Sequence, residues 1–519
     1  MEHPQGPEKQ SGRASTAQLI HRLTHRHGDR PAGPHAVVVG GGVSGLLAAR
    51  DLAAAGHAVT VLEAGSAWGG CVGVHEVAGL RLDSGAESFA TRTTAVADLA
   101  AELGLGGRLV SPNPAGAWVA LPDGPVPLPR TGILGIPADV HAPEVRAALG
   151  RSGVLRAALD ARLPVTVGTT EKTSSVADLV RARMGERVLD RLVAPVVAGV
   201  HSADPELLDV DMVAPGLRAG IREHGSLAAA VAALRGAAGE TDGTGQAPAR
   251  PGSAVGGLSG GMHVLVEALV AGLERAGVDL RLRHTATVVS RTAAGTWTVG
   301  WDHAGAPGGV EAEVLVLATD GPTVVRLLGA EVPALVPLAP ERGPNVRLVT
   351  LVVDLPDLDA APRGTGVLVA PQTPGIRAKA LTHATAKWEW LADETGPGTH
   401  VLRLSYGRAG DVASEAVRLG GGGPGDAELF ADALADATIL LATPISVSDV
   451  LGWDVVRWRG ALPFAAVGHK ARMAQLRDLA DREPGLLVVG GWVAGNGLAA
   501  VVADTRARVA ALAGRGTTA

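Results

Sequence analysis

The chain has 519 residues, enough for about two to four domains and a large hydrophobic core. Hydrophobic residues make up 46 % of it, and its 71 glycines and 33 prolines stay below the share typical of low-complexity chains, so we expect a globular protein. The formal net charge of −6 argues against a dedicated nucleic-acid binder. A single cysteine, Cys71, cannot form an intrachain disulfide, a structural zinc site or an iron–sulfur cluster.

The two ends of the chain carry features that bear on targeting. Residues 1–34 are polar and lack the apolar stretch of a secretory signal, so we expect a disordered tail. Residues 485–503 are uncharged over 19 positions, close to the roughly 20 that cross a bilayer. Because this stretch holds five glycines and Asn496, we expect a buried strand, turn and helix instead of a membrane span.

The first motif in chain order is a strand–turn–helix–strand unit. Residues 35–39 are an apolar run of buried parallel-strand type, a helix extends to about residue 55, and residues 58–62 predict the next strand. The turn fits G-x-G-x-x-G, whose glycines allow a tight turn and let the helix N-terminus approach a pyrophosphate. An acid closing the second strand would accept hydrogen bonds from ribose hydroxyls. The alternative is a plain glycine turn with a surface glutamate. The predicted dinucleotide site comprises Gly40, Gly41, Gly42, Val43, Ser44, Gly45 and Glu63.

The later elements follow from helical or alternating hydrophobic periodicity. We expect a hairpin near Trp118 and a flexible loop over residues 236–257, which are rich in glycine. The predicted helices are 95–103, 176–191, 226–234, 262–276 and 499–512, and the predicted strands are 280–283, 297–299, 314–318, 346–353, 400–405 and 486–489.

The sequence after Glu63 resembles a flavoprotein motif. Gly69 and Gly70 follow the acid by six and seven residues, which is similar to the FAD-binding extension of the amine-oxidase-like flavoproteins. That family usually has arginine where this chain has Ala67.

Further segments, in family order from Val37 to about Ala510, resemble the HemY-type porphyrinogen oxidases. These comprise protoporphyrinogen oxidase and the coproporphyrinogen III oxidase of Gram-positive bacteria. The chain departs from the family pattern at Ala198, His201, Ala203 and Ala499. The matching segments are 83–89, 128–137, 192–204, 258–266, 287–289, 380–388, 402–410, 457–469 and 489–498.

The resemblance implies an α/β plus α+β fold. It has a discontinuous Rossmann-like FAD-binding domain, a mixed-sheet substrate domain and a helical cap domain. The expected boundaries are 35–95, 258–330 and 478–519 for the FAD-binding domain, 96–138 and 331–477 for the substrate domain, and 139–235 for the cap.

The resemblance also implies the chemistry. A porphyrinogen loses six electrons in three two-electron rounds to FAD, and dioxygen reoxidises the flavin to give hydrogen peroxide. We expect coproporphyrinogen III as the substrate, in haem biosynthesis and in the cytoplasm. Protoporphyrinogen IX, a carotenoid desaturase or amine oxidase activity, a non-catalytic flavoprotein role, the oligomeric state and a weak peripheral membrane contact stay open. No metal site, nucleic-acid partner or catalytic acid or base is predicted.

Two groups of site residues are carried over from the matching segments. Plain packing is the alternative for Val288 and Trp458, and a solvated surface position is the alternative for each cation. The cations are expected to pair with the carboxylates of the porphyrinogen. The implied cofactor residues are Ala64, Gly69, Gly70, Gly85, Ala86, Glu87, Ser88, Val288, Trp458, Gly490, Gly491, Asn496, Gly497 and Leu498, and the implied substrate residues are Arg92, Arg377, Lys379 and Lys387.

Overall fold

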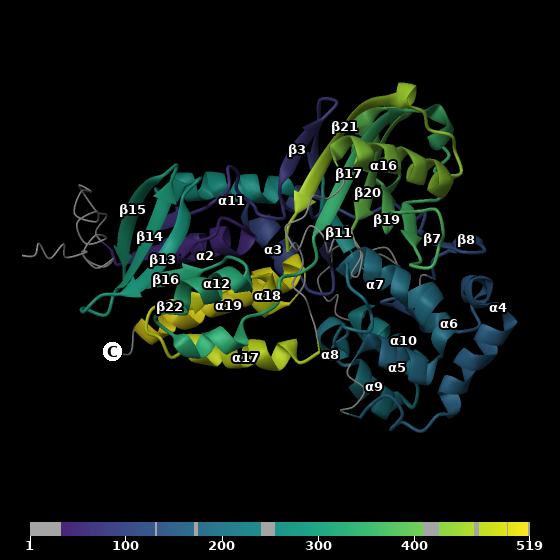
Figure 1. The fold of residues 1–519 in the computed structure, drawn as a ribbon, viewed down its shortest axis with the longest axis horizontal. Helices are drawn as coiled ribbons and strands as arrows, with labels where there is room; N and C mark the ends of the chain where they lie inside the picture. The colour runs from purple at the N-terminus through teal and green to yellow at the C-terminus, as the bar shows by residue number, and fades with distance from the viewer. Residues whose placement is uncertain are drawn as a thin grey trace, which may run out of the picture.

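The computed structural model describes residues 33–129, 132–170, 175–239, 255–407, 425–460, 467–495 and 497–516. Figure 1 shows three parts. A parallel sheet with its helices forms one end of the molecule, a mixed sheet forms the other, and a helical unit lies beside the mixed sheet. Nearly all of the predicted tail, residues 1–32, lies outside the described residues.

The first part is built on a five-stranded parallel sheet. Its central strand β1 is apolar at every position after His35 because both faces are buried, and Val38 pairs with Val61 on one side and Val316 on the other. The predicted strands at 35–39, 58–62, 314–318 and 486–489 are all present in it. The strand order is β12 (Asp279–Arg281), β2 (Ala58–Leu62), β1 (His35–Val39), β16 (Val314–Leu317) and β22 (Leu486–Val488).

Helices cover one face of this sheet and a mixed layer covers the other (Figure 1). The first face carries α2 (Val43–Ala54), α3 (Ala95–Glu102), α11 (His263–Arg275) and α19 (Leu498–Gly516). The second carries α12 (Gly321–Leu328), α17 (His469–Ala480) and the antiparallel strands β13 (Thr285–Arg291), β14 (Trp297–His303) and β15 (Ala306–Ala312).

Two helices, α3 and α17, pack in a different part of the molecule from the one that the predicted domain boundaries assign to them. Val96 and Leu99 of α3 are buried in the core under α2, and Met473 and Leu476 of α17 are buried under β16 and β22. Both helices therefore belong to the part with the parallel sheet, although the boundaries at 96 and 477 assign them to the mixed-sheet part.

The predicted loop 236–257 is wrong at both ends. Helix α10 runs Leu227–Gly239, and strand β11 (Val255–Leu258) pairs with β5 (Phe89–Ala90) and β6 (Leu109–Val110). Residues 240–254 lie outside the described residues. Gly257 at the end of the predicted loop serves packing, because a Cβ there would lie 2.7 Å from the Trp388 ring.

The second part is a seven-stranded mixed sheet with helix α16 (Asp426–Leu441) on one face (Figure 1). All of its strand pairs are antiparallel except β18 with β7, and β7 and β8 form the predicted hairpin near Trp118. The order is β21 (Val450–Trp458), β17 (Val346–Asp354), β20 (Thr399–Tyr406), β19 (Ala380–His383), β18 (Gly366–Val369), β7 (Trp118–Leu121) and β8 (Gly124–Pro127).

The third part is a helical unit whose apolar core also includes Val119 and Leu121 of β7. The predicted helix over 176–191 is interrupted: α5 ends at Arg183, and Gly185 takes a φ of +91°, which an L-residue adopts only under strain. A short helix (Glu186–Val188) and a π turn (Leu189–Val193) follow. The main helices are α4 (Pro143–Ala158), α5 (Val176–Arg183), α7 (Ala194–His201), α9 (Leu217–His224) and α10.

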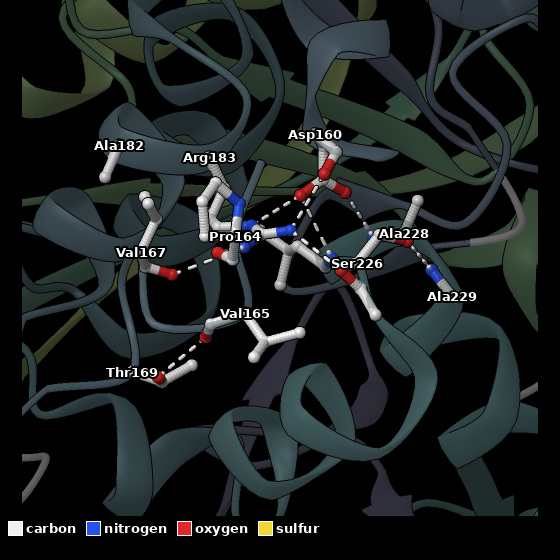
Figure 2. Close-up of polar contacts among 12 residues, drawn as sticks. Asp160, Pro164, Val165, Val167, Thr169, Ala182, Arg183, Ser226, Ala228 and Ala229 are labelled. Atoms are coloured by element: carbon white, nitrogen blue, oxygen red, sulfur yellow. Dashed lines mark hydrogen bonds and ion pairs between the residues drawn. The ribbon is translucent and has the colours of Figure 1, made fainter. Parts of the chain in front are cut away.

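A buried ion pair fixes the helices of this unit (Figure 2). Asp160 accepts from the Nε of Arg183 at 2.6 Å and from the backbone N–H groups of Leu227 and Ala228 at 3.1 and 2.9 Å, so it caps the N-terminus of α10. Arg183 also donates to the carbonyl oxygens of Pro164 and Gly225 at 2.9 and 3.2 Å. With every charge paired, both side chains can stay almost fully buried.

Among the described residues, no helix is long and apolar enough to cross a membrane. The stretch 485–503 forms β22, a short helix α18 (Gly491–Ala494) and the start of α19, as expected.

Candidate functional site

The candidate site begins where the parallel strands end. Strands β1, β2 and β22 run in the same direction, so the turns that follow them lie at one edge of the sheet. These turns carry Gly40–Gly45, Glu63 and Gly490–Leu498, which the sequence predicts as one site. The structure places all of them at that common edge except Asn496, which lies outside the described residues.

The turn before α2 is shaped by glycines. Gly40 has a φ of +110°, and a Cβ on Gly45 would lie 1.9 Å from the Gly40 carbonyl oxygen. A Cβ on Gly42 would meet nothing closer than 4.0 Å. No side chain caps α2 at Gly42, so the first-turn N–H groups, including those of Val43 and Ser44, face an approach that stays open to a phosphate.

Glu63 lies against this turn. Its Oε2 accepts from the Gly41 N–H at 2.7 Å and its Oε1 accepts from the Gly65 N–H at 2.6 Å. The carboxylate therefore braces both loops, and each oxygen keeps a further lone pair for a ribose hydroxyl. Ala64 is exposed beside it.

The second glycine pair lies directly against the first turn. The Gly69 N–H donates to the Gly41 carbonyl at 2.8 Å, and Gly42 and Gly69 form a parallel β-bridge. Gly69 and Gly70 both have positive φ, at 106° and 57°. Two segments whose bridged residues are 27 positions apart thus make one glycine-lined cradle. Ala67 is exposed near it and offers no long side chain.

A loop after β4 (Leu80–Asp83) connects this cradle to the mixed sheet. Asp83 accepts from the backbone N–H groups of Met262 and His263 at 2.9 and 3.0 Å, which caps α11. The Ala86 N–H donates to the Cys71 carbonyl at 2.8 Å, and a Cβ on Gly85 would lie 2.1 Å from the same oxygen. The loop is therefore held tightly against the segment that follows Gly70.

Glu87 of this loop is the centre of a charge cluster. Its Oε1 is 2.6 Å from the Lys387 Nζ and its Oε2 is 3.0 Å from the Arg403 Nη2. Burial would raise the pKa of Glu87, but Arg403 and Lys387 outweigh it and hold the pKa at about 2. Glu87 is thus ionised at neutral pH, and the three side chains carry one net positive charge. Ser88 follows it and is half-buried.

The C-terminal turn is also glycine-rich. Gly490 and Gly497 have φ of 129° and 111°, and Gly491 opens α18 while Leu498 opens α19. The Trp492 indole donates to the Thr319 carbonyl at 3.0 Å, which ties the turn to the end of β16. Asn496 lies outside the described residues.

The two remaining predicted cofactor contacts lie in different places. The Trp458 indole donates to the Ser84 carbonyl at 2.8 Å, so β21 reaches the Gly85 loop. Val288 is half-buried in β13. The start of this strand lies beside Glu63, because the N–H of His284 donates to the Glu63 carbonyl at 2.8 Å.

The structure does not bring the four predicted substrate cations together. Only Lys387 joins the Glu87 cluster. Arg92 is exposed, and Arg377 is 64 % exposed and pairs with Asp432 on α16 at 2.6 Å. Lys379 is fully buried, where it donates to the Ser202 hydroxyl and to the Gly407 carbonyl. Their roles toward a substrate stay predictions.

Sequence reasoning missed Arg403 as a site residue. Besides Glu87, Arg403 binds the Gly85 carbonyl at 2.8 Å through its Nη1. Arg403 lies in segment 402–410, which matches the family pattern, and this match was the sequence signal that could have identified it. Next to it is a cavity of about 40 Å³, lined among others by Asp83, Thr350 and Trp390. The Thr350 hydroxyl and Trp390 indole have no hydrogen-bond partner within the described residues, and the cavity is large enough for a water to bind them.

Residues 43–506 match the family of flavin containing amine oxidoreductases. The chain belongs to this family and is an oxidoreductase. The coproporphyrinogen III oxidase of Mycobacterium leprae is 32 % identical over 92 % of this chain and 97 % of its own length, and that of Bacillus subtilis is 25 % identical over 92 % and 97 %. A crystal structure from Exiguobacterium sp. 255-15, assigned as a protoporphyrinogen oxidase, has a TM-score of 0.77 at 24 % identity, covering 94 % of this chain and all of that one.

These relatives confirm the predicted resemblance to the HemY-type porphyrinogen oxidases, and the predicted α/β flavoprotein fold is confirmed. The family binds a flavin, and the residues of the cradle fit one. The space above Gly42 is open, and a Cβ at this position would narrow it. The uncapped N-terminus of α2 points toward this space, and Glu63 lies beside the turn.

Proposed function

We propose that the chain is an FAD- and oxygen-dependent coproporphyrinogen III oxidase of haem biosynthesis, acting in the cytoplasm. The observation that carries the proposal is the bridge between Gly42 and Gly69 beside Glu63, since it builds a cradle for a dinucleotide. The substrate follows from relatives that carry this name and match over nearly their whole length.

The chain's own residues have separate tasks in this proposal. The first-turn N–H groups of α2 bind the pyrophosphate, and Glu63 accepts from the ribose hydroxyls. Gly490 and Gly491 let the backbone approach the flavin ring. FAD, when bound, supplies the acceptor for each hydride that the porphyrinogen loses.

The Glu87 cluster adds electrostatics to this site. Glu87 fixes the positions of Lys387 and Arg403, and the net positive charge of the three favours negative charge on a reduced ring or on a substrate carboxylate. Arg92, Arg377 and Lys379 stay proposed carboxylate partners at other positions. The mixed sheet forms the substrate domain and the helical unit the cap.

Turnover in air tests the proposal. Purified FAD-loaded protein receives coproporphyrinogen III or protoporphyrinogen IX, and porphyrin fluorescence and hydrogen peroxide are followed together. We expect a strong preference for coproporphyrinogen III with three peroxides per porphyrin. A preference for protoporphyrinogen IX would make the chain a protoporphyrinogen oxidase instead. No turnover of either substrate, despite bound flavin, would support a non-catalytic role.

A further inference from the structure

Helix α17 reaches from the parallel-sheet part to the helical unit, where its start lies beside the short helix α8 (Val210–Val213; Figure 1). Two hydrogen bonds join the segments that precede these two helices. The Val467 N–H donates to the Leu207 carbonyl and the Gly468 N–H donates to the Asp209 Oδ2, both at 3.3 Å. The body of α17 is buried against the parallel sheet, so its start is a fixed point to which the helical unit is attached.

Asp209 connects this junction to the rest of the helical unit. Its Oδ1 accepts from the Asp211 N–H at 2.9 Å, which caps α8, while its Oδ2 accepts from Gly468. Residue 209 also forms a β-bridge with Ser175, the N-cap residue of α5. The junction is therefore continuous with both α5 and α8.

His469, the first residue of α17, extends the contact to the C-terminal glycine turn. Its side chain is buried, and its Nε2 lies 2.8 Å from the Trp492 carbonyl oxygen. Burial lowers the pKa of His469, so the ring is neutral at pH 7 and carries one proton. Because a carbonyl only accepts, that proton is on Nε2, and the ring donates to the backbone of α18.

Trp492 is held from a second side as well. Its indole donates to the carbonyl at the end of β16, and a Cβ on Gly321 would lie 2.8 Å from the indole ring. The ring therefore packs directly on the start of α12. The bond from His469 and the bond from the indole together fix the turn 490–494, where the proposed function places the flavin ring.

We propose that His469 is a positioning residue, which holds the flavin-side turn in register with the helical unit. The inference rests on the proposed function for the place of the flavin. The path runs from Asp209 through the start of α17 to the Trp492 carbonyl, and each step is a hydrogen bond or a peptide bond. Docking of the helical unit on α17 therefore also steadies the turn beside the flavin.

Two variants of the flavin-loaded protein test the histidine. His469→Phe keeps an aromatic ring but lacks the donor, whereas His469→Gln keeps an N–H group near the position of Nε2. We expect His469→Phe to lower the fluorescence anisotropy of the bound flavin, because the ring is held less firmly. We also expect kcat to fall at least about fivefold with KM changed less than about twofold, and His469→Gln to restore both readouts.

Asp209→Asn tests the connection from the helical unit. Asparagine keeps an oxygen for the α8 cap but has no second acceptor for the Gly468 N–H. We expect the flavin anisotropy to fall less than in His469→Phe, in the same direction. Asp204→Asn is the matched control and should leave the anisotropy unchanged, because it removes the same charge from the same loop, and its Oδ1 accepts from the Glu206 N–H and not from α17.

The inference is overturned if His469→Phe keeps the wild-type anisotropy, if His469→Gln behaves like His469→Phe, or if Asp209→Asn and Asp204→Asn behave alike. The two aspartate variants decide the matter even where His469→Phe does not fold. The anisotropy is measured without porphyrinogen. A wild type that binds flavin but turns over no porphyrinogen would therefore contradict the proposed function alone, and normal turnover with unchanged anisotropy in the variants would contradict this inference alone.

Discussion

Glu87 accepts from two cations that come from distant parts of the chain, Lys387 and Arg403. Its pKa in the folded protein is about 2, against 4.5 for an ordinary glutamate. Because the folded value is the lower one, the ionised carboxylate stabilises the fold above pH 4.5, and this contribution is lost as the pH falls toward 2. The difference corresponds to about 3 kcal/mol, as an order of magnitude.

Glu87→Gln should therefore lower the free energy of unfolding at pH 7 by about 3 kcal/mol. The gap between the variant and the wild type should narrow as the pH falls from 4.5 toward 2. Denaturant titrations across this range measure it, with the exposed Glu76→Gln on β3 (Val74–Val77) as the control. A gap that is constant with pH would show that the cluster contributes packing and not charge.

At the scale of an element, the turn between β1 and α2 separates two roles of glycine. Gly42→Glu should leave the fold intact, because the position is open, but should weaken flavin binding about tenfold or more by placing a charge in the phosphate approach. Gly42→Ala should also keep the fold, since Gly42 has a φ of −73°, and should weaken flavin binding less than Gly42→Glu, because a methyl group narrows the approach without adding a charge. The flavin-to-protein absorbance ratio after purification measures both, and full flavin in Gly42→Glu would rule out this cradle.

Gly45→Ala should act on the element itself. The new methyl would lie 1.9 Å from the Gly40 carbonyl, so the strand and helix must move apart. We expect a loss of stability of about 1–3 kcal/mol, as for other overpacked positions. Thermal unfolding with and without added flavin measures it. A variant as stable as the wild type would mean that α2 and β1 pack less closely than described.

Helix α10 depends on the buried pair in the helical unit. Removing one partner in Arg183→Met leaves Asp160 charged and buried, which should cost about 3–5 kcal/mol. Hydrogen exchange should show this loss in α5 and α10 first, while amides of the parallel sheet keep their protection. Arg181→Met in the same helix is the control, because this side chain is 39 % exposed, and equal exchange in both variants would contradict the assigned role of the pair.

The elements predictable from sequence are those with a strong local pattern. The apolar run of β1 and the glycine turn after it are encoded locally, and so is the acid at Glu63. Strand β11 was missed because Gly256 accommodates Phe89 and Gly257 accommodates Trp388, contacts that no local pattern shows. The charge cluster was missed for the same reason. Motifs identify Glu87 and Lys387 separately, but they are 300 positions apart, and only the fold pairs them.

The whole molecule has distinct hydrophobic clusters for the parallel-sheet part, the mixed sheet and the helical unit, and the last of these also includes Val119 and Leu121 of β7. Chains built this way often unfold in more than one step. The flavin cradle belongs to the first part, and a ligand stabilises the part that binds it by mass action. Bound flavin should therefore raise the stability of the parallel-sheet part more than that of the helical unit.

Tryptophan fluorescence and far-ultraviolet circular dichroism can separate these transitions. The segment 139–239 contains no tryptophan, so tryptophan fluorescence does not report directly on the helical unit. Trp297, in contrast, is buried in the parallel-sheet part. We expect added flavin to shift the fluorescence transition upward and to leave a helical component of the dichroism transition nearly unmoved. Arg183→Met should lower only that helical component. If the fluorescence and dichroism transitions coincide in the wild type and in Arg183→Met alike, the three cores unfold as one cooperative unit.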